Sequence, residues 1–207
     1  YSCHPKTHIE GTGFIVSKRI RHLILDFEAI SLRLCKLRIK GKFFNFSIVC
    51  SYAYAPTEDK TEEEKEIFYE NLDKIYYSCP KYDVKIILGD LNAKVGRERE
   101  FKFVTGGFSL HDTTNDNGHK LIYFAASHNM IIGSTSFQHK NIHKATWHAP
   151  CRTYANHIDH ILIVARHYSD LMDGRTYHGA NVDSDYFLVI AKVRSRLSNA
   201  KKFKGET

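Results

Sequence analysis

Apolar residues recur along this chain with two different periods, and each period predicts a different element. In the segment FNFSIVCS (44–51), Phe44, Phe46, Ile48 and Cys50 fall on one face and polar residues on the other. Such a period of two is typical of a half-buried strand. Similar apolar runs predict strands at 13–17, 21–27, 31–40, 84–88, 130–133, 143–148, 157–164 and 186–194.

Two segments change to the helical period. Between residues 61 and 79, apolar side chains recur at spacings of three and four, as on one face of a helix. Thr61 followed by Glu64 fits a capping box at the start of this helix. A second helix is predicted over 117–129. The predicted buried faces are Phe68, Leu72, Ile75 and Tyr76 in the first helix and Leu121, Phe124, Ala125 and His128 in the second.

The order of these elements predicts an α/β domain in which mixed sheets carry helices on the outside. The 207 residues suffice for one large domain, which we expect to span 1–197, with a basic tail at 198–207. No apolar run approaches the roughly 18 residues that a membrane-spanning helix needs.

Charge and cysteine content narrow the function classes. The net charge of +7 makes a polyanion such as nucleic acid a reasonable partner, although a solvated basic surface explains it equally well. The five cysteines have no CxxC spacing, so we expect reduced thiols in an intracellular protein. The 13 histidines likewise lack a zinc-binding spacing and are expected at the surface.

Polar residues interrupt the chain at the ends of four apolar strands. The clearest case is KIILGDLNAKVG (85–96), where a buried strand ends in Asp90 and Asn92. In an extended chain these two side chains point to the same side, which suits a metal ion, a phosphate or an activated water. Taken alone, the motif is better explained as an ordinary turn after a strand, because such short motifs often match by chance. The other three islands are YAPT (54–57), Asp159 within an apolar strand, and DSD (183–185).

Several motifs in order resemble the endonuclease/exonuclease/phosphatase superfamily, the DNase I-like fold. They are YAPT (54–57), GDLNAKVG (89–96), TW (146–147), HIDHILI (157–163) and SDYFLV (184–189). The chain is similar in particular to endonuclease domains of LINE-type retrotransposons and to the craniofacial development protein 2-like group, which resembles RTE-type elements. The likeness covers residues 11 to about 197.

This resemblance implies a four-layer sandwich of two mixed sheets flanked by helices, and phosphodiester cleavage in DNA with Mg²⁺ or Mn²⁺. It implies that Tyr54 contacts the scissile phosphate, that Asp90 orients or deprotonates the attacking water, and that Asn92 holds both. Asp185 and Asp90 would lie on the metal side, and Asp159 would orient the catalytic histidine. The same resemblance places Thr146, Trp147 and Arg175 against nucleic acid; for Trp147 a role in the core is equally open.

Two departures from the family pattern put activity in doubt. Where the family has Ser-Asp-His, this chain has Ser184-Asp185-Tyr186. Tyrosine offers a neutral hydroxyl with a pKa of about 10, whereas histidine titrates near neutrality. The family also begins with strands that carry an Asn and a metal-binding Glu, but only ten residues precede Gly11 here, so we expect an N-terminally truncated copy.

The leading hypothesis is therefore an impaired, metal-dependent endonuclease of retrotransposon origin. The alternative is a catalytically inactive remnant that binds nucleic acid or a protein. A phosphorylated lipid or inositol is a third substrate class open to this fold. A nuclear location is expected from a DNA substrate.

Overall fold

A six-stranded sheet forms the centre of the molecule. The computed structural model describes residues 2–3, 11–31, 34–51, 55–179 and 184–194. The strand order is β3-β4-β5-β6-β10-β7, with β5 and β6 parallel and the other neighbours antiparallel, so the sheet is mixed as predicted. Its strands are β3 (Ile24–Ala29), β4 (Leu34–Ile39), β5 (Phe46–Ser51), β6 (Val84–Asp90), β7 (Met130–Ile132) and β10 (Asp159–Val164).

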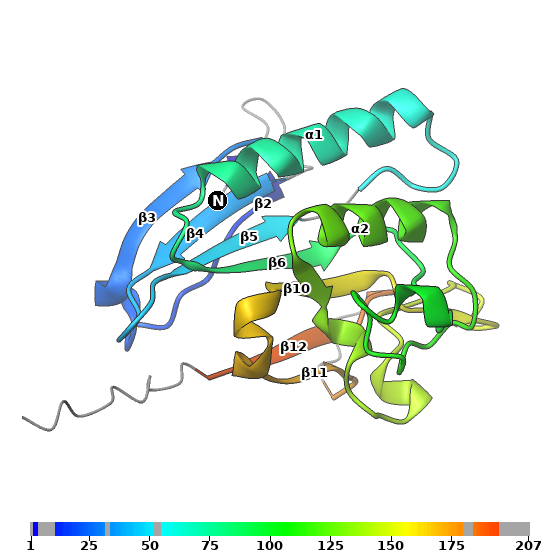
Figure 1. The fold of residues 1–207 in the computed structure, drawn as a ribbon. Helices are drawn as coiled ribbons and strands as arrows, with labels where there is room; N and C mark the ends of the chain where they lie inside the picture. Colours follow the sequence, from blue (N-terminus) through cyan, green and yellow to red (C-terminus); the bar gives the residue numbers. More distant parts are fainter. Residues whose placement is uncertain (1, 4–10, 32–33, 52–54, 180–183, 195–207) are drawn as a thin grey trace, which may run out of the picture.

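The two faces of this sheet are covered differently. Helices α1 (Glu62–Ser78) and α2 (Asp116–Ser127) lie on one face, and the antiparallel pair β11 (Leu171–Tyr177) and β12 (Leu188–Val193) lies on the other (Figure 1). The mixed α/β sandwich that the resemblance implies is confirmed. Among the described residues it has three layers rather than four, because no α-helix covers the outer face of the β11–β12 pair, where Leu188 and Ile190 are exposed.

Alternation along the central strands creates two separate apolar cores. In β6, Val84 and Ile86 pack towards Leu171 and the β11–β12 pair, whereas Ile87 packs towards the helices beside Leu72. A strand buried on both faces reads as a continuous apolar run rather than an alternating one. The sequence VKIIL therefore predicts a central strand, and this is its position.

Both helices form where the periodicity predicts them. Thr61 caps α1 with the predicted capping box: its hydroxyl accepts from the Glu64 N–H, and the Glu64 carboxylate accepts from the Thr61 N–H. The predicted faces of both helices are buried, apart from Tyr76, which is partly buried against the core. Helix α2 begins at Asp116, one residue earlier than predicted, because the Asn115 side chain caps it by accepting from the Gly118 N–H.

Three strand predictions need correction. Residues 13–17 form no strand: Phe14 packs edge-on against Phe27, and the Ile15 side chain is fully exposed. The segment 143–148 contributes only the short strand β8 (Trp147–His148), paired with β9 (Ala155–Asn156). Strand β11 was not predicted, because its apolar residues are interrupted by charged ones.

The face assigned to the segment 44–51 is also reversed in part. Ser47 is fully buried on the helix side of β5, whereas Phe46 and Ile48 on the opposite face are only half-buried. The Ser47 hydroxyl donates to Asp83 Oδ2 at 2.7 Å, and the Arg38 guanidinium donates to the same oxygen at 2.8 Å. A buried polar pair with satisfied hydrogen bonds thus occupies the position that alternation assigns to solvent.

The remaining elements are short, and none of the described helices has the length and apolar character of a bilayer-spanning helix. They are β1 (Ser2–Cys3), β2 (Gly11–Thr12) and the 3₁₀ helices η1 (Arg21–Leu23), η2 (Arg99–Phe101), η3 (Gly133–Thr135), η4 (Asn141–His143) and η5 (Ala165–Asp170).

Candidate active site

Two carboxylates face each other at the end of the central strands. Asp90 closes β6 and Asp159 opens β10, and the antiparallel register places them directly opposite each other. Asp90 is 7% exposed, and Asp159 Oδ2 is buried without a hydrogen-bond partner among the described residues. Two facing carboxylates are stable only when a proton or a cation reduces their charge.

The electrostatics of the pair follow from this placement. Burial, first, and the neighbouring Asp90 together raise the pKa of Asp159 to about 7, while Thr146 opposes the shift. Burial also raises the pKa of Asp90, against the hydrogen bonds that it accepts from Asn92 and Tyr186. Carboxyl groups that bind or release a proton near neutral pH are suited to general acid–base chemistry.

Tyr186 contacts the acid pair through Asp90. Its hydroxyl donates to Asp90 Oδ2 at 3.2 Å. The backbone holds it there, because Trp147 and Tyr186 form an isolated β-bridge and the Phe187 N–H donates to the Thr146 carbonyl at 2.8 Å. The resemblance predicts that residue 186 pairs with Asp159; the tyrosine contacts Asp90 instead, and Asp159 keeps an unpartnered oxygen.

Asn92 connects Asp90 with the YAPT segment (54–57) through hydrogen bonds. Its N–H donates to Asp90 Oδ1 at 2.9 Å, and its side-chain amide donates to the Ala55 carbonyl at 2.6 Å. Asn92 has a φ of 46°, so β6 turns at this point and the predicted extended i, i+2 arrangement of Asp90 and Asn92 is wrong. The Asp90 carboxylate instead contacts the Asn92 backbone N–H, in an Asx turn.

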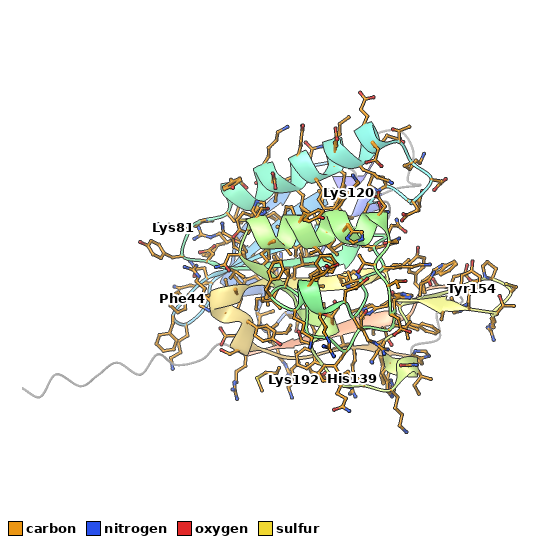
Figure 2. The ribbon with its side chains drawn as sticks, turned by 45° about the vertical axis from the view of Figure 1, so that its right-hand side comes forward. Phe44, Lys81, Lys120, His139, Tyr154 and Lys192 are labelled. Carbon is orange, nitrogen blue, oxygen red and sulfur yellow. The ribbon has the colours of Figure 1, made fainter. Side chains whose placement is uncertain are left out.

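The other predicted site residues have varied positions. Asp185 is half-buried, and its carbonyl accepts from the His148 N–H at 3.0 Å. Tyr54, like Asp183, lies outside the described residues. Trp147 is half-buried with its ring 5.9 Å from that of Tyr154, at the hairpin β8–β9, and Tyr154 points away from the body of the molecule (Figure 2).

Thr146 and Arg175 differ in how well they fit the predicted contact with nucleic acid. Arg175 is exposed on β11, with its Nε 3.6 Å from Asp173. Thr146 is only 1% exposed, so the structure contradicts its assignment to a binding surface. Its hydroxyl accepts from the N–H groups of Ile158 and Asp159, at 3.0 and 3.2 Å, and so fixes the start of β10.

A group of buried histidines lies behind the carboxylate pair, where the sequence predicted surface residues. His160 points to the opposite face from Asp159, as alternation predicts, and its ring bonds Ser134 and the Ala93 carbonyl, each at 2.8 Å. Burial lowers the pKa of His160 and of His111 to about 4 and that of His157 well below its usual value. These rings are therefore neutral structural groups and no substitute for the missing catalytic histidine.

The fit of a divalent cation depends on the acid pair. No group of three or more His, Cys, Asp or Glu side chains within the described ranges is placed to hold a metal ion. Mg²⁺, however, is usually held by one or two carboxylates with waters and substrate phosphates. The unpartnered Asp159 Oδ2 beside Asp90 meets that requirement, so the residues present fit such an ion.

Two residues organise the site in ways that the sequence did not predict: Asn117 was not recognised at all, and Thr146 was assigned another role. Asn117 is buried in α2, and its amide donates to the carbonyls of Pro56 and Asn92, at 2.7 and 3.0 Å. Thr146 acts through Asp159. Both lie far along the chain from the groups that they hold, and neither stands in an apolar stretch that would mark it as buried.

Comparisons with known proteins agree with this geometry. No family model matches the chain. Craniofacial development protein 2 of Bos taurus is 37% identical over 187 residues, which cover 90% of this chain and 31% of that protein. The protein of the same name from Tragulus javanicus is 36% identical and is covered over 32% of its length. The chain thus spans about a third of the relatives it matches.

Solved structures show the same fold at low sequence identity. The endonuclease domain of TRAS1, a telomere-specific non-LTR retrotransposon, superimposes with a TM-score of 0.57 at 15% identity, over 81% of this chain and 66% of that one. An AP endonuclease from Archaeoglobus fulgidus gives a TM-score of 0.59 at 13% identity, over 83% and 72%. The 3′ phosphatase NExo from Neisseria, bound to a product DNA hairpin, gives 0.58 at 13% identity, over the same shares. The chain therefore has the DNase I-like fold of these solved structures, and its sequence is similar to craniofacial development protein 2 over about a third of that protein.

Proposed function

We propose that this domain is a phosphodiesterase that hydrolyses DNA with the help of a divalent cation, Mg²⁺ or Mn²⁺. The observation that carries the proposal is the facing pair of Asp90, which is buried, and Asp159, which is half-buried and whose buried Oδ2 has no partner among the described residues. The similarity to DNA-acting enzymes of the same fold supports the choice of substrate, and that to a retrotransposon endonuclease supports a retrotransposon origin.

Each described residue of the site has a role in this proposal. Asp90, whose pKa is raised by burial, accepts a proton from the attacking water at Oδ2, next to the Tyr186 hydroxyl. Asn92 holds the other oxygen of Asp90 and keeps that carboxylate oriented. Asp90 and Asp159 would hold the cation, which would supply charge stabilisation for the transferring phosphoryl group. Tyr54 would contact that phosphoryl group, and Trp147 and Arg175 the DNA strand.

A second candidate function is favoured by Tyr186 itself. A neutral hydroxyl donates a hydrogen bond, but it does not supply the positive charge of a protonated histidine. Loss of one such group typically lowers the rate by about 10²–10⁴-fold. The scaffold that binds nucleic acid is independent of this loss, so a non-catalytic DNA-binding module is the alternative.

The test is nicking of supercoiled plasmid in Mg²⁺, in Mn²⁺ and in a chelator. The parent chain, Tyr186→His and Asp90→Asn are compared after circular dichroism has shown that each is folded. We expect weak, metal-dependent nicking by the parent, an increase with Tyr186→His and none with Asp90→Asn. Absence of nicking from folded parent and Tyr186→His proteins would contradict the enzyme proposal. Salt-dependent binding of a labelled duplex by the same proteins would then identify the binding module.

A further inference from the structure

Two cysteines face each other across the neighbouring strands β4 and β5 of the central sheet. The antiparallel register of β4 and β5 pairs Cys35 directly with Cys50. Residues opposed in this way have Cα atoms about 4.5 or 5.5 Å apart. A disulfide spans Cα separations of roughly 4.4–6.8 Å, so this backbone geometry accommodates one without rearrangement.

The side chains of the pair also converge. Both sulfur atoms lie 3.7 Å from the same oxygen, the Thr12 hydroxyl, which covers them from β2. They therefore project from one face of the sheet, opposite to Val49 and the helices.

The two thiols are not equivalent. Cys35 is fully buried, whereas Cys50 is half-buried and thus open to a small reagent. The hydrogen bond that Cys35 donates lowers the pKa of Cys50 to about 7, while the same contact and burial raise the pKa of Cys35. At neutral pH the proton stays on Cys35, and Cys50 has thiolate character, which is the reactive form of cysteine.

We propose that Cys35 and Cys50 form a redox-active pair that closes to a reversible intrachain disulfide on reaction with a hydroperoxide. The Cys50 thiolate attacks the peroxide, so that an S–O bond forms, the O–O bond breaks and the released hydroxide becomes water. Cys35 sulfur then attacks the Cys50 sulfenic acid: the S–S bond forms, the S–O bond breaks, and its hydroxide leaves as water with the Cys35 proton. Two thiols and one hydrogen peroxide thus give one disulfide and two waters.

Cys79 and Cys151 lack this arrangement. Cys79 is buried and donates to the Ile75 carbonyl at 3.3 Å, in the last turn of α1. Cys151 is exposed at the tip of the hairpin β8–β9 and lies 3.0 Å from the Thr153 hydroxyl. Cys79 therefore serves as a buried internal control.

The primary test is peptide mapping of the whole chain carrying Cys3→Ser and Cys151→Ser, which removes the side reactions of those two thiols. The protein is treated with stoichiometric hydrogen peroxide, alkylated after unfolding, and digested with trypsin without reduction. We expect a cross-linked species joining peptide 34–36 to peptide 43–60, lost on treatment with dithiothreitol, while Cys79 remains alkylated. Recovery of Cys35 and Cys50 as alkylated thiols from folded, peroxide-treated protein would overturn the proposal.

A second measurement tests the order of attack. In Cys35→Ser, a sulfenic-acid probe should label Cys50; in Cys50→Ser, labelling of Cys35 should be at least roughly tenfold slower, because that thiol is both buried and protonated. Equal labelling of Cys35 and Cys50 would refute the assigned roles. Thr12→Val should move the pH midpoint of Cys50 alkylation upward, since the hydroxyl no longer stabilises the thiolate; an unchanged midpoint would exclude Thr12 from the site.

Discussion

Replacing Asp159 by asparagine should stabilise the protein at alkaline pH. The pKa of Asp159 is raised from 3.8 to about 7, so the folded protein holds a proton in this range that the unfolded chain has already released. The stability contributed by this group is complete below pH 3.8 and is lost as the pH rises through about 7. Asparagine has the same shape and never ionises, so the Asp159→Asn variant does not lose it.

The size of the gain follows from the shift. Three pKa units at about 1.4 kcal/mol each set a ceiling of about 4 kcal/mol above pH 7. Asp159 is half-buried, and solvent reduces its interaction with Asp90, so we expect about half of that, roughly 2 kcal/mol, at pH 8. At pH 4 both side chains are neutral, and the difference in unfolding free energy should be close to zero.

Urea denaturation measured between pH 4 and pH 8 provides the assay, with the fluorescence of Trp147, the single tryptophan, as the probe. Asp112→Asn, which removes a carboxylate that is 87% exposed, is the matched control and should show no such pH dependence. Added Mg²⁺ should stabilise the parent at pH 8 and the Asp159→Asn variant much less. A variant that is less stable than the parent by the same amount at both pH values would refute the facing-carboxylate argument.

Three further predictions concern the surroundings of the site. Tyr186→Phe removes a hydrogen-bond donor to Asp90. Because Tyr186 is 42% exposed, the expected effect is about 1 kcal/mol, which NMR would detect as an upward shift of somewhat less than one unit in the pKa of Asp90. A downward shift would contradict the prediction. The pKa of His160 is lowered, so its contribution to the unfolding free energy is complete above pH 6.5 and is lost as the pH falls to about 4. His160→Gln should therefore reduce the loss of unfolding free energy at acid pH by up to about 3 kcal/mol. The same loss at acid pH in the variant and the parent would contradict this prediction. Asp83→Asn leaves Arg38 without its buried partner and should lower the unfolding free energy by about 3 kcal/mol, whereas a neutral result would mean that water compensates the pair.

The elements with a strong period were predictable because packing and local propensity agree there. Helix α1 combines an apolar face, an acidic first turn and a capping box, and all three indicate the same boundaries. Strand β6 was equally clear as a continuous apolar run. Residues 13–17 failed for the opposite reason: they have the composition of a strand, but their contact with the sheet is made by the Phe14 ring rather than by backbone pairing.

The acidic residues of the site could be predicted from the sequence, but the residues that hold them in place could not. Asp90 and Asp159 stand out because a carboxylate beside an apolar strand needs a partner. The register of the strands determines which residues face each other, and a single sequence does not reveal that Asp159 lies opposite Asp90. Thr146 and Asn117 hold the site through backbone contacts made across the fold, and a hydrogen bond to a distant carbonyl leaves no local pattern.

The tyrosine at position 186 changes what the acid pair requires. A protonated histidine there would bring a positive charge between two carboxylates and so keep both ionised at neutral pH. The Tyr186 hydroxyl donates to Asp90 but brings no charge, and Asp159 Oδ2 keeps no partner among the described residues. The pair must therefore take up either a proton or a cation, and these two compete for the same oxygens. Metal affinity should consequently rise with pH across the range in which Asp159 titrates, around pH 7. A tyrosine in place of a histidine at position 186 thus removes an acid–base group and at the same time makes the two carboxylates depend more strongly on a cation.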